Sequence, residues 1–538
     1  MMDKQIFYNG MITTLDETWP QVEALYTENG RIMAIGSAEE IMRQFGRTDV
    51  TKIDLDGGYA YPGFVDSHLH IALLGAKLDQ LDLSGCKDKD ELLATIRTEA
   101  AQIPLDQWII GYGWNDERME GRMPDLAELN QASLGRPLLL SRVCEHVYLV
   151  NEAAYRRAEL TEEVKNPSGG IYGRDPFGKL NGWVYDQAVL PFQEAQKHIS
   201  LQQRRQQIER AMKMALKEGL TGIHTDDLRE IGSLHNLIDL YRDLHQKRIG
   251  LRTHHLIYYP YVTEWDELDK NQLEADEWFS LGAVKIFADG TFGGRTAWLT
   301  QPYADDPEKS TGISIHSVEE LHDLAKQATN RGLPIAIHAI GDQAIEETLT
   351  VMQKYRSAPG KSASPLRHRL IHALLLRQDL LEQLKQMPIA VDIQPHFVAS
   401  DFPWVERRLG EERLRYAYAW RSMIEAEIQC AGGSDAPIEP LSPIKGFYTA
   451  VFRHSLAADA PKEGYLPKER LNRLQALQLY TKGSAYAANE EHQRGTLSVG
   501  KQADISVFDH DLLTVEDEEL RKATAIQTIV NGQIVYER

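Results

Sequence analysis

The central part of the chain alternates between short apolar runs and longer segments whose apolar residues recur at helical spacing. In one such segment, Ser317 and Glu320 have the spacing of a capping box, apolar residues follow on one helical face, and Gly332 ends the pattern. The apolar run 333–338 comes next and is typical of a strand. Residues 208–224 repeat the same order. A helix between successive strands predicts βαβ units and therefore a parallel sheet.

Eight apolar runs of this kind predict the strands of one sheet. They begin near Gly63, Leu220, Leu251, Ala283, Pro334, Arg369, Ile389 and Ile428. Eight βα units indicate an α/β fold in which the sheet closes into a TIM-type (β/α)8 barrel, with its functional residues at the carboxyl ends of the strands. We expect this barrel to comprise residues 61–77 and 201–489.

Both ends of the chain contain short β-type runs, within residues 1–60 and 490–538. Turn signals separate these runs, among them the Asn-Gly pairs at 9–10 and 531–532. Either end alone is too short to build two packed layers. We therefore expect one small β-sandwich built from both termini. The alternative is two separate β-structures attached to the barrel.

About 150 residues separate the first two predicted barrel strands, whereas a βα connection usually takes about 2–6 residues. This segment has strand-like runs of its own, near Gln107–Tyr112 and Pro137–Val143. The sequence therefore predicts an inserted subdomain at residues 78–200, which we expect to lie over the mouth of the barrel.

Composition narrows the class of protein. The 538 residues are 42% hydrophobic and 26% charged, which favours a packed core, and the net charge of −20 gives nucleic-acid binding little electrostatic support. No apolar run is long enough to span a membrane, and the start of the chain lacks the apolar core of a signal peptide. The sparse cysteines, Cys86, Cys144 and Cys430, fit a reducing compartment. We expect a soluble cytoplasmic protein.

Ionisable residues lie within or at the end of five of the eight predicted strands. His68 and His70 are two residues apart in the first strand and therefore share a face, while Lys285 lies inside an apolar run, where an unpaired ammonium group is costly. Three further strands end with His338, His372 and Asp435. Imidazoles and carboxylates are the usual ligands of zinc and similar ions. Each residue alone has an ordinary structural explanation, but together they favour a metal site.

The motifs around these residues resemble those of the amidohydrolase superfamily. His68-Leu69-His70 follows Pro62-Gly63-Phe64-Val65-Asp66, and His338, His372 and Asp435 come in the same order as the superfamily's ligands. Segments 284–290, 338–342 and 433–437 are similar to amidohydrolase family 3, the YtcJ-like branch, which includes an N-substituted formamide deformylase. Cys144-Glu145-His146 matches it as well.

The resemblance implies two divalent metal ions, zinc first, bridged by Lys285 after carboxylation of its side-chain nitrogen by CO₂ or bicarbonate. His68 and His70 would hold one ion, and His338 and His372 the other. Asp435 would bind the first ion and act as the catalytic base. The chain departs from the family pattern at one position, where Ile371 replaces a glutamate. Because adjacent strand residues face opposite ways, we expect Ile371 to point toward the helices.

The expected activity is metal-dependent hydrolysis of a non-peptide C–N bond, an amide or N-acyl or N-formyl group, in a small molecule. The nucleophile would be hydroxide generated at the metals, with Asp435 moving the proton. Two alternatives are cleavage of a cyclic amide or ester at the same site, and a non-catalytic metal-binding barrel. The expected partner is a small-molecule amide, with no nucleic acid and no membrane. A homodimer is expected only as the commonest soluble assembly.

Substrate contacts are expected from loops after the strands and from the insert. The candidates are Trp114, His146, Arg295 and His396. The two histidines would orient a carbonyl or make ordinary hydrogen bonds. Arg295 would bind a carboxylate or pair with an aspartate, and Trp114 would recognise substrate or pack inside the insert.

Overall fold

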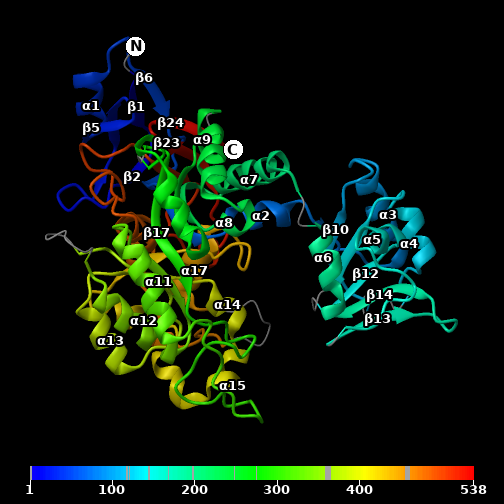
Figure 1. The fold of residues 1–538 in the computed structure, drawn as a ribbon. Coiled ribbons are helices and arrows are strands. Elements are labelled where there is room, and N and C mark those ends of the chain that lie inside the picture. The colour runs from blue at the N-terminus through cyan, green and yellow to red at the C-terminus, as the bar shows by residue number, and fades with distance from the viewer. Residues whose placement is uncertain are drawn as a thin grey trace. The chain divides into compact units, whose positions relative to one another are not determined.

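The computed structural model describes residues 3–538 with several gaps (Figure 1). The gaps are residues 117, 118, 120, 121, 143–145, 168, 197, 198, 248, 274, 275, 358–364 and 455–460. Cys144 and Glu145 of the motif noted above therefore lie outside the described residues. Contacts divide the chain into two compact units, with unit 1 formed by Met1–Leu73 and Glu209–Arg538 and unit 2 by Leu74–Ile208.

Unit 1 contains an eight-stranded parallel sheet, and each predicted barrel strand is present. Its strands are β8 (Phe64–Leu69), β15 (Leu220–Thr225), β16 (Arg252–Tyr258), β17 (Phe279–Phe287), β18 (Ile335–Ala339), β19 (Arg369–His372), β20 (Ala390–Ile393) and β21 (Gln429–Gly432), in the spatial order β21-β20-β19-β18-β17-β16-β15-β8. The two edges meet through backbone bonds, since the N–H of Asp435 donates to the carbonyl of His68 (2.7 Å) and the N–H of His70 to that of Ala436 (2.8 Å). The sheet is a nearly closed barrel, which confirms the predicted fold class.

Unit 1 also contains helices that lie between and after the barrel strands in the sequence. They include α8 (Leu228–Ile231), α9 (Leu234–Gln246), α11 (Val318–Asn330), α12 (Asp342–Lys354), α13 (Gln378–Lys385), α14 (Phe397–Asp401), α15 (Trp404–Leu409), α16 (Trp420–Glu425), α17 (Pro443–Phe452), α18 (Arg473–Gln478), α19 (Ser484–Ala487) and α20 (Asp517–Leu520), while α2 (Ile71–Leu78) and α7 (Leu201–Lys217) cross the unit boundary. Helix α11 begins with the predicted capping box between Ser317 and Glu320 and buries Leu321 and Ala325. Among the described residues, none of the helices is both long and apolar enough to cross a membrane.

The two termini share one β-structure. A six-stranded sheet has the order β24-β23-β22-β7-β2-β3, in which β7 (Tyr59–Pro62) pairs with β2 (Met11–Thr13) on one side and with β22 (Ile505–Phe508) on the other. A four-stranded sheet, β5-β4-β1-β6, belongs to the N-terminal segment alone. The remaining strands of both sheets are β1 (Lys4–Tyr8), β3 (Gln21–Val22), β4 (Ala24–Glu28), β5 (Arg31–Gly36), β6 (Thr51–Asp54), β23 (Ala525–Val530) and β24 (Gln533–Glu537).

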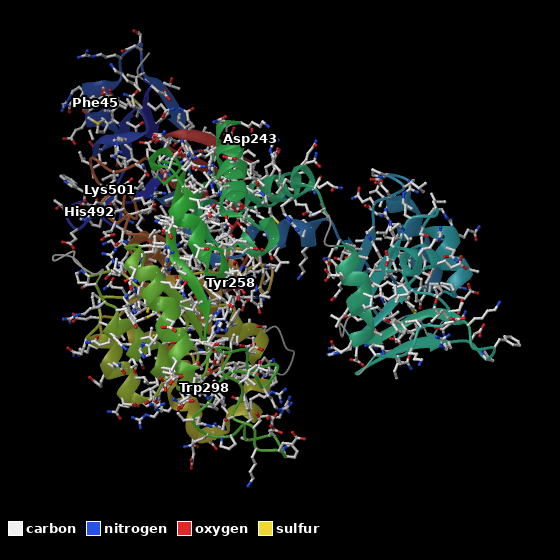
Figure 2. All side chains as sticks on the ribbon, viewed as in Figure 1. Phe45, Asp243, Tyr258, Trp298, His492 and Lys501 are labelled. Carbon is white, nitrogen blue, oxygen red and sulfur yellow. The ribbon has the colours of Figure 1, made fainter. Side chains whose placement is uncertain are left out.

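One apolar core joins residues from both ends of the chain. It contains Phe7, Ile12, Leu25, Ile32 and Ile53 from the N-terminal segment and Leu497, Ala503, Ile505, Val507 and Ile529 from the C-terminal segment. A second, smaller cluster lies under α1 (Ala38–Phe45), where Phe45, labelled in Figure 2, stacks on Tyr26 with 4.1 Å between ring centroids. Neither terminus could bury this much apolar surface alone, which is why both ends contribute.

Unit 2 is built on its own six-stranded sheet, in the order β13-β14-β12-β11-β10-β9. Its elements are β9 (Leu81–Asp82), α3 (Lys89–Ala100), β10 (Ile109–Trp114), α4 (Leu126–Ala132), β11 (Leu138–Arg142), β12 (Val147–Val150), α5 (Glu152–Arg157), β13 (Gly170–Arg174), β14 (Leu180–Asp186) and α6 (Leu190–Gln196). Leu138 and Leu140 of β11 pack in one cluster and Leu139 in another, because both faces of the sheet are buried. The expected position of this unit over the barrel mouth stays a prediction.

Candidate metal centre

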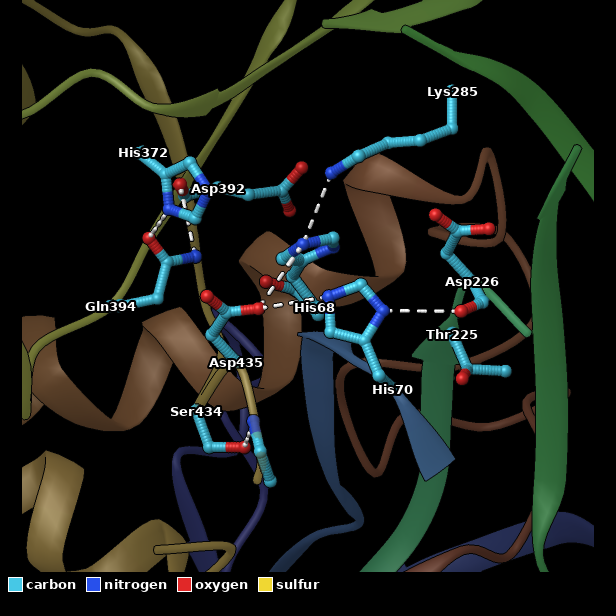
Figure 3. A network of polar contacts seen from close by, with 12 residues as sticks. His68, His70, Thr225, Asp226, Lys285, His372, Asp392, Gln394, Ser434 and Asp435 are labelled. Carbon is cyan, nitrogen blue, oxygen red and sulfur yellow. Dashed lines mark hydrogen bonds and ion pairs between the residues drawn. The ribbon is translucent and has the colours of Figure 1, made fainter. Parts of the chain in front are cut away.

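The six predicted metal ligands line a single pocket at the carboxyl ends of the barrel strands. Figure 3 shows His68, His70, Lys285, His372 and Asp435 close together. The pocket has a volume of about 340 Å³. His68, His70, Lys285, His338, His372 and Asp435 all contribute to its wall. Parallel strands bring their carboxyl ends to the same side of the barrel, so residues more than 300 positions apart meet there.

The core of the site is a cluster of two histidines and one aspartate. Oδ1 of Asp435 lies 3.5 Å from Nε2 of His68 and 3.2 Å from Nε2 of His70. Nδ1 of His70 donates to the backbone carbonyl of Asp226 (3.1 Å), which turns Nε2 toward Asp435. One donor atom from each of the three residues lies within 4.8 Å of the others, as the ligands of one metal ion would.

Lys285 brings an amine into the same cluster. Its side chain is fully buried, and its Nζ lies 3.3 Å from Nε2 of His68. Burial removes the ammonium form from water and lowers the pKa of Lys285 to about 8, although nearby carboxylates act in the opposite direction. At neutral pH the neutral amine form of Lys285 is therefore populated far more than that of a lysine in solvent.

His338 and His372 form the other half of the site. Their rings are 4.4 Å apart between centroids. Nε2 of His338 donates to the carbonyl of Gly290 (3.1 Å), and Nδ1 of His372 donates to Oε1 of Gln394 (2.7 Å). Burial lowers the pKa of both imidazoles, that of His372 to about 4. Each is thus a neutral ring with one nitrogen held and the other available to a metal ion.

The expected orientation of Ile371 is wrong. Ile371 packs in a buried cluster made only of strand residues, with Ala283 and Ala336 among its members. Those alanines lie two positions before Lys285 and His338 and thus face the barrel interior with them. Ile371 also pairs in register with His338. The next residue still reaches the site because the backbone turns at the strand end, where His372 has a φ of +79°.

Two buried carboxylates, neither of which was assigned a role from the sequence, hold the loops that carry the ligands. Asp66 accepts hydrogen bonds from the N–H of Ser434 (3.0 and 3.1 Å), which ties β8 to the loop after β21. Asp289 accepts from the N–H groups of Gly341 (2.8 Å) and Trp298 (2.9 Å; labelled in Figure 2). Burial raises the pKa of each aspartate to about 7, against the effect of these N–H groups.

Unsatisfied atoms show that the donor set fits a cation. Among the described residues, Nδ1 of His68 is buried without a hydrogen-bond partner, and Oδ1 of Asp435 faces the imidazoles of His68 and His70 at 3.5 and 3.2 Å. Although burial acts against its charged form, contact with His70 and its neighbours holds the pKa of Asp435 below the usual value. Although burial acts against its charged form, the hydrogen bond with Asp435 raises the pKa of His70. Nitrogen and oxygen donors gathered in this way suit zinc and related divalent ions.

The rest of the pocket wall is apolar with two carboxylates. Phe287, Phe292, Ile340, Leu374, Phe397, Trp404 and Ile438 supply the apolar surface, and Asp401 and Glu439 the carboxylates. Phe292 lies in the loop that leads to the candidate Arg295, and the other residues were not anticipated from the sequence. Most lie at the end of a barrel strand or in the loop that follows it, so their position in the sequence was the available signal.

His396 and Arg295 are both held by other side chains. Nδ1 of His396 lies 3.2 Å from Oγ1 of Thr449, and its Nε2 lies 3.5 Å from Oε2 of Glu439. Arg295 donates from Nε and Nη2 to Asp305 (3.2 and 3.1 Å), the pairing that had been the alternative to carboxylate binding. A direct contact of His396 with substrate stays a prediction.

Trp114 and His146 belong to unit 2. Trp114 is fully buried in the apolar core, and its indole N–H donates to the carbonyl of Leu140 (3.1 Å), so it exposes no surface to a ligand in this structure. His146 is exposed, with Nδ1 3.0 Å from Oδ1 of Asp186. In this structure Trp114 therefore packs in the core of unit 2, and the role of His146 in substrate recognition stays a prediction.

A nearly closed barrel with imidazoles, a buried lysine and an aspartate at its carboxyl end has the architecture of the metal-dependent hydrolases. The amidohydrolase family matches residues 51–536, and the chain belongs to this family. YtcJ of Bacillus subtilis (strain 168), whose name places it with the amidohydrolases, is 38% identical over 99% of this chain and 100% of its own length. These matches confirm the resemblance drawn from the motifs.

Two further comparisons extend along nearly the whole chain. The N-substituted formamide deformylase of Arthrobacter pascens is 27% identical over 98% of this chain and 98% of its own. The crystal structure of an uncharacterized metal-dependent hydrolase from Pyrococcus furiosus is 28% identical and superposes with a TM-score of 0.79, covering 95% of this chain and 100% of that one. The protein is accordingly a metal-dependent hydrolase of the amidohydrolase family.

Proposed function

We propose that this protein hydrolyses a non-peptide C–N bond, an amide or N-acyl bond, in a small molecule. The observation that carries the proposal is the buried Asp435, which faces His68 and His70 beside the amine of Lys285 in an open-ended pocket. The similar N-substituted formamide deformylase is named for the same class of reaction. The expected products are an amine and a carboxylic acid.

The residues present suggest how metal ions would be held. His68, His70 and Asp435 would hold one ion, and His338 and His372 a second, with carboxylated Lys285 between them. Carboxylation joins the lysine nitrogen to the carbon of CO₂ and releases a proton, which requires the neutral amine that burial favours. When bound, divalent ions such as zinc supply Lewis acidity and lower the pKa of water.

Asp435 is positioned to move the proton. It would accept a proton from the attacking water and return it to the leaving nitrogen, as a general base and then a general acid. The N–H of Asp435 is anchored on the carbonyl of His68 (2.7 Å), and Asp66 holds the preceding residue, Ser434. The carboxylate is therefore fixed before substrate arrives, and the apolar wall limits competing water.

The test compares Asp435→Asn with wild-type protein and with Asp323→Asn, a matched change on the exposed face of α11. We expect Asp435→Asn to lose about 10²–10⁴-fold in kcat while keeping bound metal, and the control to lose nothing. A panel of amides, lactams, esters and phosphoesters identifies the bond that is cleaved. Near-wild-type turnover by Asp435→Asn would remove its role as the base, and esters cleaved in preference to amides would overturn the proposed bond class.

A further inference from the structure

One carboxylate beside the candidate metal centre is buried without a hydrogen bond. Asp226 follows β15 directly, and its side chain is fully buried. Among the described residues, neither of its carboxylate oxygens has a hydrogen-bond partner. A carboxylate in this state is costly, because it has lost its contacts with water and gained no donor in exchange. Charge, rather than hydrogen bonding, therefore has to stabilise it.

Other buried carboxylates of the barrel differ from Asp226 in this respect. Asp227, the next residue, accepts a hydrogen bond from the hydroxyl of Tyr241 at 2.6 Å. Asp392 is paired with Arg369 at 2.9 Å. The two aspartates that hold the ligand loops accept from backbone N–H groups. Each of these four carboxylates has donors that replace water, so their burial has a structural explanation that Asp226 lacks.

The backbone of Asp226 fixes this residue beside the metal centre. Its carbonyl accepts from Nδ1 of His70 (3.1 Å), and its N–H donates to the carbonyl of Leu69 (3.2 Å). Figure 3 shows its carboxylate turned toward the side chain of Lys285. Burial lowers the pKa of Lys285, and the charge of Asp226 is the largest effect in the opposite direction. The carboxylate therefore acts on the centre through its charge.

Direct contact with a substrate or a metal ion does not account for this carboxylate. Asp226 is not among the described residues that line the pocket, and it is fully buried, so a substrate has no surface of it to touch in this structure. Among the described residues, the ligand atoms that gather within 4.8 Å of one another come from His68, His70 and Asp435, without Asp226. What Asp226 contributes at this distance is a negative charge.

The proposed two-ion centre has an excess of positive charge that this residue offsets. Two divalent ions bring four positive charges, and imidazoles bind metal ions as neutral ligands. Asp435 and a carboxylated Lys285 bring one negative charge each. Two positive charges are left in a buried site, where unbalanced charge is costly. The carboxylate of Asp226 offsets one of them, and a hydroxide from water offsets the other.

We infer that Asp226 is a positioning residue of the metal centre, whose charge stabilises the second divalent ion together with carboxylated Lys285. This inference rests on the two-ion centre of the proposed function and does not depend on which bond is cleaved. Carboxylation replaces the amine of Lys285 by an anion, which the carboxylate of Asp226 repels unless both ions are present. Asp226 thus couples the modification of the lysine to the binding of metal.

The experiment measures zinc per chain by plasma mass spectrometry, and zinc affinity by competition with a chelator, on the full chain supplied with zinc and bicarbonate. Asp226→Asn keeps the shape of the side chain and the backbone contact with His70 but removes the charge. We expect wild-type protein to hold two equivalents and Asp226→Asn to bind the second ion about 10–100-fold more weakly. Unchanged affinity for the second ion in Asp226→Asn would overturn the inference.

Further variants separate the charge of Asp226 from its shape. Asp226→Glu keeps the charge on a longer side chain and should bind the second ion more tightly than Asp226→Asn does, whereas a role in packing alone would favour Asp226→Asn because of its matching size. Asp226→Ser is a second uncharged variant and should behave like Asp226→Asn. Thermal unfolding of chelated protein establishes that each variant is folded. Weaker zinc binding by Asp226→Glu than by the uncharged variants would overturn the inference.

The neighbouring carboxylate provides the matched control. Asp227→Asn removes a buried charge one residue further along the chain, on a side chain held by Tyr241, and should leave zinc affinity unchanged. A loss as large as that of Asp226→Asn would overturn the specific role of Asp226. A single equivalent of zinc in wild-type protein would overturn the two-ion centre, and the inference with it. Substrate hydrolysis is measured separately, so a failed amide panel leaves the zinc result standing.

Discussion

Replacing Lys285 with methionine tests both how much the buried amine destabilises the fold and whether the amine is needed to bind metal. Methionine has a similar length and no charge, so it fills the space without leaving a cavity. The native side chain is fully buried, and its Nζ lies 3.3 Å from Nε2 of His68. We expect Lys285→Met to be more stable than the wild-type chain when both are free of metal, and to bind less metal.

The size of this effect follows from the pKa of Lys285, which burial lowers from 10.5 to about 8. A shift of this size corresponds to about 3 kcal/mol against the protonated form in the folded chain. Because the folded pKa lies below the unfolded one, the penalty is fully present below pH 8 and disappears as the pH rises toward 10.5. At pH 7 the variant should gain about 1–3 kcal/mol, since packing of the methionine recovers only part of the difference.

The assay measures thermal unfolding of chelated protein at pH 7, and metal content per chain by plasma mass spectrometry. A gain of this size should raise the unfolding midpoint by several degrees, at about 2–4 °C per kcal/mol for a barrel-sized domain. Lys326→Met, on the exposed face of α11, is the matched control and should change neither quantity. A lower midpoint for metal-free Lys285→Met, or retention of two equivalents of metal, would refute the reasoning.

Two further substitutions test how the ligands are supported. Gln394→Ala removes the acceptor that orients His372 (2.7 Å). We expect it to weaken metal binding by about 10–100-fold without unfolding the chain, as measured by competition with a chelator. Unchanged metal affinity would show that this contact does not orient the ring. Arg369→Ala leaves Asp392, its partner at 2.9 Å, as an unpaired buried charge. We expect this variant to lower the free energy of unfolding of unit 1 by about 3–5 kcal/mol, measured by denaturant unfolding. The double variant Arg369→Met/Asp392→Leu should recover much of that loss, and no recovery would contradict the ion-pair explanation.

Much of the fold was predictable because it depends on local periodicity. Apolar runs separated by amphipathic segments located each of the eight barrel strands. The capping box at Ser317 and the Asn-Gly turns of the termini are also short-range signals. The candidate ligands could be found for the same reason, since a histidine, lysine or aspartate at the end of an apolar strand stands out within a few residues.

Other features could not be predicted because they depend on a single dihedral angle or on a distant contact. Alternation along β19 placed Ile371 and His372 on opposite faces, but the positive φ of His372 rotates the end of the strand, so one residue faces the barrel interior and the next the pocket. From the sequence, Trp114 was a candidate for substrate recognition. Its burial and its hydrogen bond to Leu140 are features of the tertiary structure alone. No pattern within a few residues contains that information.

By itself the sequence determined the order of the elements, the class of fold and the identity of the candidate ligands. Only the tertiary structure decided which nitrogen of each imidazole is available, how deeply Lys285 is buried, and that Asp401 and Glu439 share the pocket. The physical reason is the range of the interactions involved. Helix and strand periodicity act over a few residues, whereas the environment of a side chain is made by segments as distant as Asp66 and Ser434, 368 positions apart.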